Sequence, residues 1–291
     1  MDLLQFKYFQ TVARLEHMTR AAGELQVAQP ALSATISKLE DDLGVELFNR
    51  TGRSIVLNEF GKVFLKRVDK ILREVEEGRQ EISDMSGSES GFVAFSSTSL
   101  NKEFGDFIFS FNKLYPKVNF HITQLGDDKT KIHLLETNEI DFAFINTVKE
   151  YPTISAVPLL VEDIFLAVSP EHYLASRGEV SLGELTNEPF INMTADHSLQ
   201  EFCDYIYQKN GFTPKVICEC SESSAIVNLV AAGIGISFYP CVEEKREQQP
   251  IVLLKIKDLK YKNILQIAWK KKRYFSKAAI NFRDYVINYF V

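Results

Sequence analysis

Two short helical patterns, separated by very little chain, restrict the fold of the first 58 residues. Residues 21–25 place apolar side chains on one helical face, and Pro30 opens a second helix that ends at Gly44. Two helices joined this tightly predict a helix-turn-helix. The second helix carries one apolar stripe, which must be buried. The stripe consists of Leu32, Ile36, Leu39 and Leu43.

The opposite face of the second helix carries small and hydroxyl side chains, which suit the close approach of a DNA duplex. In a helix-turn-helix, the N-terminal part of the second helix enters the major groove, where hydroxyls can bond phosphates or base edges. With Pro30 as the first helical residue, Gln29 takes the capping position, which favours Ser, Thr, Asp or Asn. A locally poor residue often marks a functional site, and glutamine can pair with adenine; the alternative is a tolerated weak cap. The candidate DNA contacts on this helix are Gln29, Pro30, Ser33, Ala34, Ser37 and Lys38.

Further candidate DNA contacts flank this helix. Residues 45–58 alternate in polarity and turn in the middle, as a short hairpin would. Arg50 and Arg53 lie beside its tip, where guanidinium groups suit phosphates. Thr19 and Arg20 open the first helix of the pair, where Thr19 can act as the cap and backbone N–H groups can meet a phosphate. Ordinary capping and solvated charge are the alternatives for these four residues.

The charge and composition exclude several classes of protein. A net charge of −6 argues against indiscriminate coating of nucleic acid, but a small DNA-binding module needs only a positive docking surface. Ten cations against two acidic side chains lie in 255–291, where the KKKR run at 270–273 is expected to be a solvated surface. No apolar run approaches the roughly 18 residues of a membrane span. Four cysteines without a secretion signal predict reduced thiols in a cytoplasm.

Residues 59–85 predict one long helix with a narrow apolar seam. Apolar residues recur at spacings of 3, 4 and 7 from Phe60 to Ile82, and charges fill the other faces. A helix of this length extends about 40 Å. Such a seam needs a partner helix, so we expect dimerisation here; the alternative is packing on the chain's own core. The following SGSESG segment, 86–91, is typical of a flexible hinge.

From Phe92 onward, strand and helix patterns alternate, which predicts an α/β architecture. Ligands bind such sheets at the carboxyl ends of strands, and two lobes would place a pocket between them. Hydroxyl and amide side chains at strand and helix ends are therefore candidates to bind a small molecule, although turn and capping chemistry favours the same residues. These effector-binding candidates are Ser97, Thr98, Ser99, Thr147, Asn192 and Ser198.

The N-terminal segment from Thr19 to Gly61 closely resembles the winged helix-turn-helix of LysR-type transcriptional regulators. The resemblance extends more weakly to 134–145 and 227–240, which look like the family's first-lobe and second-lobe motifs. It implies an α+β multidomain protein: a DNA-binding domain at 1–58, a dimerising linker helix at 59–86 and a two-lobed, periplasmic-binding-protein-like α/β effector domain at 87–291. Lobe 1 would take about 92–161 and 267–291, and lobe 2 about 162–266. The residues that carry the resemblance are Ala21, Ala22, Leu25, Gln29, Pro30, Ser33, Ile36, Leu39, Glu40, Leu43, Gly44, Leu47, Phe48, Arg50, Leu57 and Gly61.

The resemblance implies a bacterial cytoplasmic regulator, a homodimer or homotetramer, that binds double-stranded DNA at an inverted-repeat operator. An effector between the lobes would change the placement of the DNA-binding modules. Thiol redox sensing is the main alternative, but where peroxide-sensing members carry a His-Cys pair this chain has His197-Ser198. A solute-binding module would need a secretion signal. An enzyme is not expected, because no catalytic motif is present, and neither a cofactor nor a metal site is expected, since Cys218 and Cys220 lack zinc-finger spacing.

Overall fold

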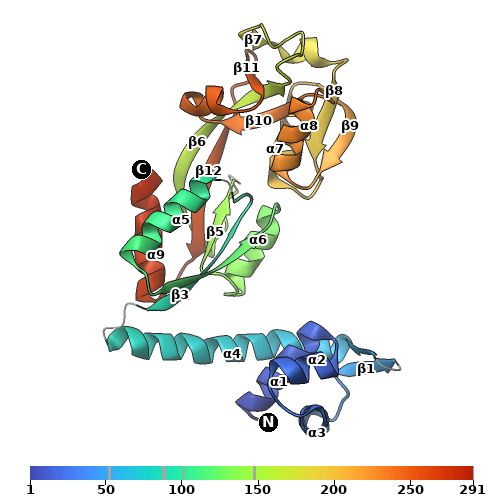
Figure 1. The fold of residues 1–291 in the computed structure, drawn as a ribbon, viewed down its shortest axis with the longest axis vertical. Coiled ribbons are helices and arrows are strands. Elements are labelled where there is room, and N and C mark those ends of the chain that lie inside the picture. The colour runs from blue at the N-terminus through green and yellow to red at the C-terminus, as the bar shows by residue number, and fades with distance from the viewer. Residues whose placement is uncertain (52–53, 87–89, 101, 147–148, 291) are drawn as a thin grey trace. The chain divides into compact units, whose positions relative to one another are not determined.

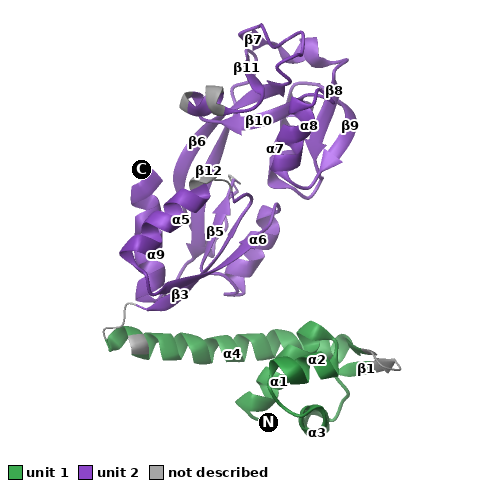
Figure 2. Cartoon of the chain, in the orientation of Figure 1, with its two compact units in different colours: residues 1–88 green, residues 89–291 purple. Residues whose placement is uncertain are grey.

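The computed structural model describes residues 1–51, 54–86, 90–100, 102–146 and 149–290. The chain divides into two compact units, residues 1–88 and 89–291, which are described separately (Figures 1 and 2). The expected order of a winged helix-turn-helix, a long helix and a two-lobed α/β region is confirmed. None of the helices in the described part of the chain is long and apolar enough to span a membrane.

The first unit begins with three helices around one core. These are α1 (Leu3–Leu15), α2 (Met18–Glu24) and α3 (Gln29–Leu43). The expected stripe is confirmed, because Leu32, Ile36 and Leu39 are fully buried and Leu43, at the end of the helix, is half-buried. The turn between α2 and α3 passes through Gln26, whose φ of 55° is left-handed. Gly44, at φ 71°, closes α3 in a conformation that a side chain would strain.

The caps of α2 and α3 differ from those expected. Thr19 lies inside the first turn of α2, and the cap is His17, whose ring nitrogen accepts a hydrogen bond from the Arg20 amide. Gln29 is the first helical residue of α3, and Ala28 before it is the cap, with no side-chain hydrogen bond. The Ala28 carbonyl instead accepts bonds from the first turn. Both expectations were wrong by one or two positions because a cap is defined by where the backbone leaves the helix.

A hairpin and the long helix complete the first unit. Strands β1 (Phe48–Thr51) and β2 (Ser54–Leu57) pair antiparallel, and α4 extends from Glu59 to Met85. The ring of Phe64 packs 5.3 Å from that of Phe9 on α1, so the beginning of α4 belongs to the core of its own unit. Farther along, Ile82 is 70% exposed and Met85 is 84% exposed. The beginning of the apolar seam therefore packs on the core of its own chain, as the alternative interpretation held. The end of the seam remains exposed in the monomer.

The second unit is built on an eight-stranded mixed sheet with the order β4-β3-β5-β12-β6-β11-β7, and β10 also pairs with β6. A separate pair, β8-β9, completes the strands. The strands are β3 (Gly91–Ser97), β4 (Val118–Gln124), β5 (Phe142–Ile145), β6 (Ile154–Val168), β7 (Glu179–Val180), β8 (Pro189–Met193), β9 (Lys215–Cys220), β10 (Ser237–Cys241), β11 (Val252–Ile256) and β12 (Lys262–Lys270). The helices are α5 (Lys102–Leu114), α6 (Asp128–Glu136), α7 (Ser198–Lys209), α8 (Ser223–Ala231) and α9 (Lys277–Phe290), with 3-10 turns η1 (Leu182–Leu185) and η2 (Glu243–Gln248).

Helices cover both faces of the strands in each lobe. In the first lobe, Phe282 of α9 stacks 5.2 Å from Phe95 of β3 in a core rich in phenylalanine, and α6 covers the opposite face. In the second lobe, Leu166 faces the core of α7, while its neighbour Phe165 faces that of α8. This alternation follows from the two-residue period of a strand.

Two long strands, β6 and β12, connect the lobes. They pair antiparallel from Lys262 opposite Asp163 to Lys270 opposite Ile154, with one irregularity between Leu265 and Gln266. The same ladder thus contributes to the sheet on both sides of the expected lobe boundaries. Figure 1 shows these two strands running between the first and second lobes.

The KKKR run is only partly the solvated surface that the charge pattern suggested. Arg273 forms an ion pair of 2.8 Å with Asp141 and donates a hydrogen bond to the Ile140 carbonyl. Lys270 donates to Asn138 at 2.9 Å. These two cations fix the loop after α6 to the end of β12, and only Lys271 and Lys272 between them are exposed.

Candidate DNA interface and effector cavity

The outward face of α3 presents the side chains expected to meet DNA. Gln29, Ala34 and Lys38 are exposed together with Pro30, and Ser33 and Ser37 are half-buried at the margin of the same face. All six candidates therefore lie on one side of the helix, opposite the buried stripe. The small side chains leave the α3 backbone accessible along its first two turns.

The neighbouring elements add candidates to this surface. Thr19 and Arg20 are exposed in the first turn of α2. The backbone of Arg50 lies in β1, paired with Ile55. Arg53 lies outside the described residues.

Acidic side chains of the first 58 residues, seven against six cations, are largely used inside the domain. Glu40 is buried and accepts a hydrogen bond of 2.8 Å from the Leu47 amide. Glu16 accepts one from the hairpin, Glu24 pairs with a cation on α1, and Asp42 pairs with the N-terminus. These carboxylates therefore have structural partners within the domain.

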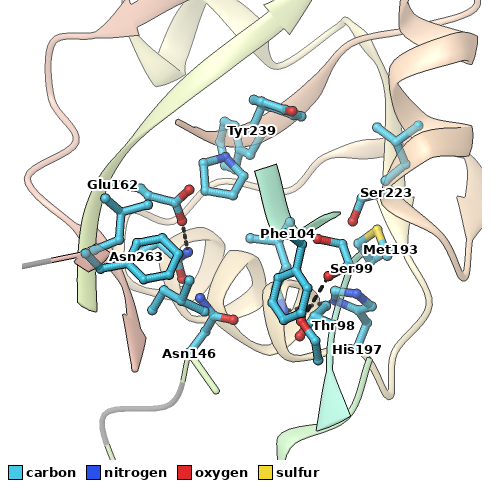
Figure 3. A pocket seen from close by; sticks show the side chains of 18 residues that line it. Thr98, Ser99, Phe104, Asn146, Glu162, Met193, His197, Ser223, Tyr239 and Asn263 are labelled. Atoms are coloured by element: carbon cyan, nitrogen blue, oxygen red, sulfur yellow. Dashed lines mark hydrogen bonds between the residues drawn. The ribbon is translucent and has the colours of Figure 1, made fainter. Parts of the chain in front are cut away.

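A cavity of about 200 Å³ lies between the two lobes of the second unit. Figure 3 shows Thr98, Ser99 and His197 grouped on one side and the hydrogen-bonded pair of Glu162 and Asn263 on the other. Ser97 also lines the cavity, so the three expected hydroxyls at the end of β3 are all present. Apolar contact surface comes from both lobes and includes Leu160, Phe104, Met193, Leu199, Ile226, Phe238, Tyr239, Leu265 and Phe290.

A buried ion pair holds Thr98 in place. Lys131 of α6 is fully buried, and its Nζ donates to Thr98 Oγ1 at 2.5 Å, to the Asp128 carboxylate at 3.0 Å and to the Phe144 carbonyl at 2.9 Å. The other carboxylate oxygen of Asp128 accepts a hydrogen bond from the Asn146 amide. Burial lowers the pKa of Lys131, and the charge on Asp128 opposes this shift. The sequence pattern gave no sign of this role for Lys131, because a lysine in a helix usually belongs to a solvated face.

His197 contributes a neutral ring to the cavity wall. It is 4% exposed and caps α7, where Nδ1 accepts a hydrogen bond from the Leu199 amide. Burial lowers the pKa of His197, and the nearby charge of Lys131 lowers it further. At neutral pH the ring is therefore an acceptor at the helix start and presents an aromatic face to the cavity.

Ser198, an expected effector contact, is not among the residues that line the cavity, and the cap of α7 is its neighbour His197. The Ser198 hydroxyl instead bridges the lobes, donating to the Gly126 carbonyl and accepting from the Asp128 amide, each at 2.9 Å. Gly126 is required at this contact, since a Cβ there would lie 2.5 Å from the His197 ring. An ion pair between Lys129 and Glu201 reinforces the same side of the junction.

Two other effector candidates have different positions. Asn192 is not among the residues that line the cavity; it is buried and accepts a hydrogen bond of 3.1 Å from the Tyr207 hydroxyl. Its neighbour Met193 lines the cavity instead, because successive strand residues face opposite sides. Thr147 lies outside the described residues, and Asn146 before it contributes to the wall.

The four cysteines are free thiols. Cys203 and Cys241 are buried, and burial raises the pKa of the Cys203 thiol strongly, which opposes formation of a reactive thiolate. Within the described ranges, no group of three or more His, Cys, Asp or Glu side chains could hold a metal ion.

Comparison with known protein families covers nearly the whole chain. Residues 3–62 match the family described as bacterial regulatory helix-turn-helix protein, lysR family, and residues 92–290 match the LysR substrate binding domain. The HTH-type transcriptional regulator YybE of Bacillus subtilis is 35% identical over 292 residues, covering 100% of this chain and 99% of the relative. The transcriptional dual regulator GltC of the same organism is 32% identical, covering 100% and 98%.

The fold is also similar to a solved full-length structure. CbnR, a LysR family regulator complexed with its target DNA, aligns with a TM-score of 0.74 at 22% identity, covering 99% of each chain.

Proposed function

Since the chain belongs to the LysR family of bacterial transcriptional regulators, we propose that the outward face of α3 reads its operator and that a small molecule in the inter-lobe cavity controls it. The protein has the family's DNA-binding and effector-binding domains. One observation carries the proposal: the exposed Gln29-to-Lys38 face of α3 lies opposite the buried stripe, in the geometry of a recognition helix.

The proposed contacts divide into base readers and phosphate binders. Gln29, exposed at the first turn of α3, would pair with a base edge, and Ser33 and Ser37 would bond bases or phosphates at the margin. Arg50 and Arg53 of the hairpin would bind phosphates as bidentate partners. Thr19 and Arg20 would meet the DNA backbone at the start of α2. Pro30, Ala34 and Lys38 would complete the surface.

The proposed effector is a small polar metabolite. A cavity of about 200 Å³ suits a compact molecule. Thr98, Ser99 and His197 offer hydroxyl and ring partners at one end, the Glu162 carboxylate offers an acceptor at the other, and aromatic walls lie between them. Because residues of both lobes line the cavity, a ligand there would bind one lobe arrangement better than another.

We place this regulator in the cytoplasm, without enzymatic activity, as a homodimer or tetramer on an inverted-repeat operator. The uncovered apolar residues of α4 support pairing of two chains. Two-fold related recognition helices would require two half-sites in opposite orientation. We propose domain boundaries at 58, at 86 and between the lobes, because they separate the DNA-binding, dimerising and effector-binding segments.

DNA-binding titrations on promoter fragments at several salt concentrations test the main proposal. Gln29→Ala should reduce discrimination between operator and random DNA by about 1–3 kcal/mol, while Arg50→Ala should weaken both about equally and lower the salt slope by about one. Lys7→Ala, an exposed cation on α1, is the control for lost charge. Binding of every fragment with equal affinity would overturn the proposal.

A thermal-shift screen of small metabolites on the full-length chain tests the effector site. A ligand at 100 times its Kd should stabilise the chain by about 2.7 kcal/mol. Thr98→Val and Ser99→Ala should reduce this shift. A ligand whose shift is unchanged in both variants would bind elsewhere.

A further inference from the structure

A pair of thiols on β9 is not used by the proposed DNA or effector sites. Cys218 and Cys220 are both half-buried, and their Sγ atoms lie 3.9 Å apart. Residues two apart on a strand point to the same face. Here that face packs against the core beneath α8, among residues such as Ile226. The two sulfurs therefore lie side by side while remaining accessible.

The strand geometry disfavours a disulfide between these thiols. The irregularity of the β8-β9 pair lies at Ile217, and beyond it Cys218 pairs with Ile191 and Cys220 with Met193 in regular register. An extended strand separates such residues by about 6.6 Å at their Cα atoms. That separation lies at the upper end of the roughly 4.4–6.8 Å that disulfides span, and the sulfurs lie 3.9 Å apart instead of about 2.05 Å, so closing a disulfide would pull on a strand whose register is regular.

A third atom can bridge the sulfurs without that distortion. Two bonds of about 2.3 Å, the zinc–thiolate length, place two sulfurs about 3.8 Å apart at a tetrahedral angle and about 4.6 Å apart when linear, and roughly 3.4 Å apart at the smaller angle of a pyramidal centre. The observed 3.9 Å is therefore closer to a bent arrangement than to a linear one, and a small rotation of the two side chains would close the remaining gap. A structural zinc site would need two further ligands, and the described residues supply no cluster of three. An atom bound here would therefore have the sulfurs of Cys218 and Cys220 as its protein ligands.

We propose that Cys218 and Cys220 form a chelating site for monosubstituted trivalent arsenicals, whose third bond is to their own organic group. Two S–H bonds and the arsenic–oxygen bond break, and two arsenic–sulfur bonds form. The thiol protons leave with the oxygen as water, and arsenic stays trivalent, so no oxidant or reductant is needed. Cys203 and Cys241 are only 5% exposed and do not compete.

Phenylarsine oxide is the probe, with intact-mass spectrometry of the folded full-length protein as the measurement. We expect one phenylarsenic group per chain, with loss of one water, that survives excess glutathione and is released by 2,3-dimercaptopropanol. Cys218→Ser and Cys220→Ser should each weaken binding by about 100-fold or more, because the second bond loses its high effective concentration. Cys203→Ser is the matched control and should bind like the wild type.

Protection from alkylation keeps the test independent of variant folding. In the wild type, one arsenical should shield both Cys218 and Cys220 from N-ethylmaleimide, as mapped on peptides. Uptake that persists in the double Cys→Ser variant would overturn the proposal. So would an adduct that glutathione displaces readily, or shielding of only one of the two thiols.

Discussion

Replacing Lys131 by methionine tests how the wall of the effector cavity is held. The substitution keeps most of the side chain's volume but removes the cation that Asp128 faces at 3.0 Å. Asp128 is 5% exposed and would keep the Asn146 amide as a partner. Breaking a buried pair by removing one partner costs about 3–5 kcal/mol. At about 2–4 °C per kcal/mol for a domain of this size, the melting temperature should fall by roughly 6–20 °C.

The chain's single tryptophan makes the assay selective. Trp269 lies on β12 against the first-lobe core, so its fluorescence reports unfolding of the second unit without signal from the DNA-binding unit. Urea titrations of Lys131→Met, Asp128→Asn and the double variant form a cycle. The free energy of unfolding should fall less in the double variant than the two single decreases added together, by a coupling energy of about 0.5–3 kcal/mol. Lys129→Met, whose side chain is 63% exposed, is the control and should shift the transition much less.

Two outcomes would refute this reasoning. If Lys131→Met unfolded at the urea concentration of the wild type, the pair would not hold the cavity wall. If the losses of the two single variants simply added, Lys131 and Asp128 would act independently. A stable Lys131→Met protein should also show a weaker ligand shift, since Thr98 loses the donor that orients its hydroxyl.

Three further predictions concern the junction of the lobes and the long helix. Because the pKa of His197 is lowered in the folded chain, the unfolded chain binds more protons between that pKa and 6.5, so the free energy of unfolding rises with pH across this window. His197→Asn, which can still cap α7, should therefore show a flatter dependence of the urea midpoint on pH. An unchanged slope would contradict this assignment. Ser198→Ala should cost about 1–3 kcal/mol in tryptophan-monitored unfolding, because the Gly126 carbonyl and the Asp128 amide lose a partner at the junction of the lobes. Ser110→Ala, whose hydroxyl bonds the Asp106 carbonyl within its own helix, should cost much less; equal losses would exclude a role for the bridge. Ile82→Glu should weaken dimerisation at least tenfold in sedimentation, Glu81→Gln should not, and equal behaviour would place the interface elsewhere.

Local patterns predicted the elements well where burial follows the helix or strand period. The stripe of Leu32, Ile36 and Leu39 is buried as expected, because apolar residues on one helical face have no alternative in a compact domain. The hydroxyls of Thr98 and Ser99 line the cavity as expected, because strand ends converge at one edge of the sheet.

The features that sequence reasoning missed depend on partners distant in the chain. Lys131 is buried because Thr98 and Phe144 supply acceptors from other strands, which a helical pattern cannot reveal. Ser198 bonds Gly126 of the other lobe, although locally it resembles a cap. Arg273 pairs with Asp141, which is distant in the sequence. Because the charge pattern alone does not show this partner, the KKKR run was expected to be solvated.

The β6–β12 ladder constrains how the second unit can deform. Separating the lobes as a hinged clamp would shear an antiparallel ladder whose hydrogen bonds continue from one lobe to the other. Rotation about the ladder's long axis is softer, because a two-stranded ribbon varies its twist at little cost, and the irregularity between Leu265 and Gln266 marks the compliant point. We therefore expect the second unit to deform mainly by twisting, so that a bound molecule would set a twist angle rather than a gap width.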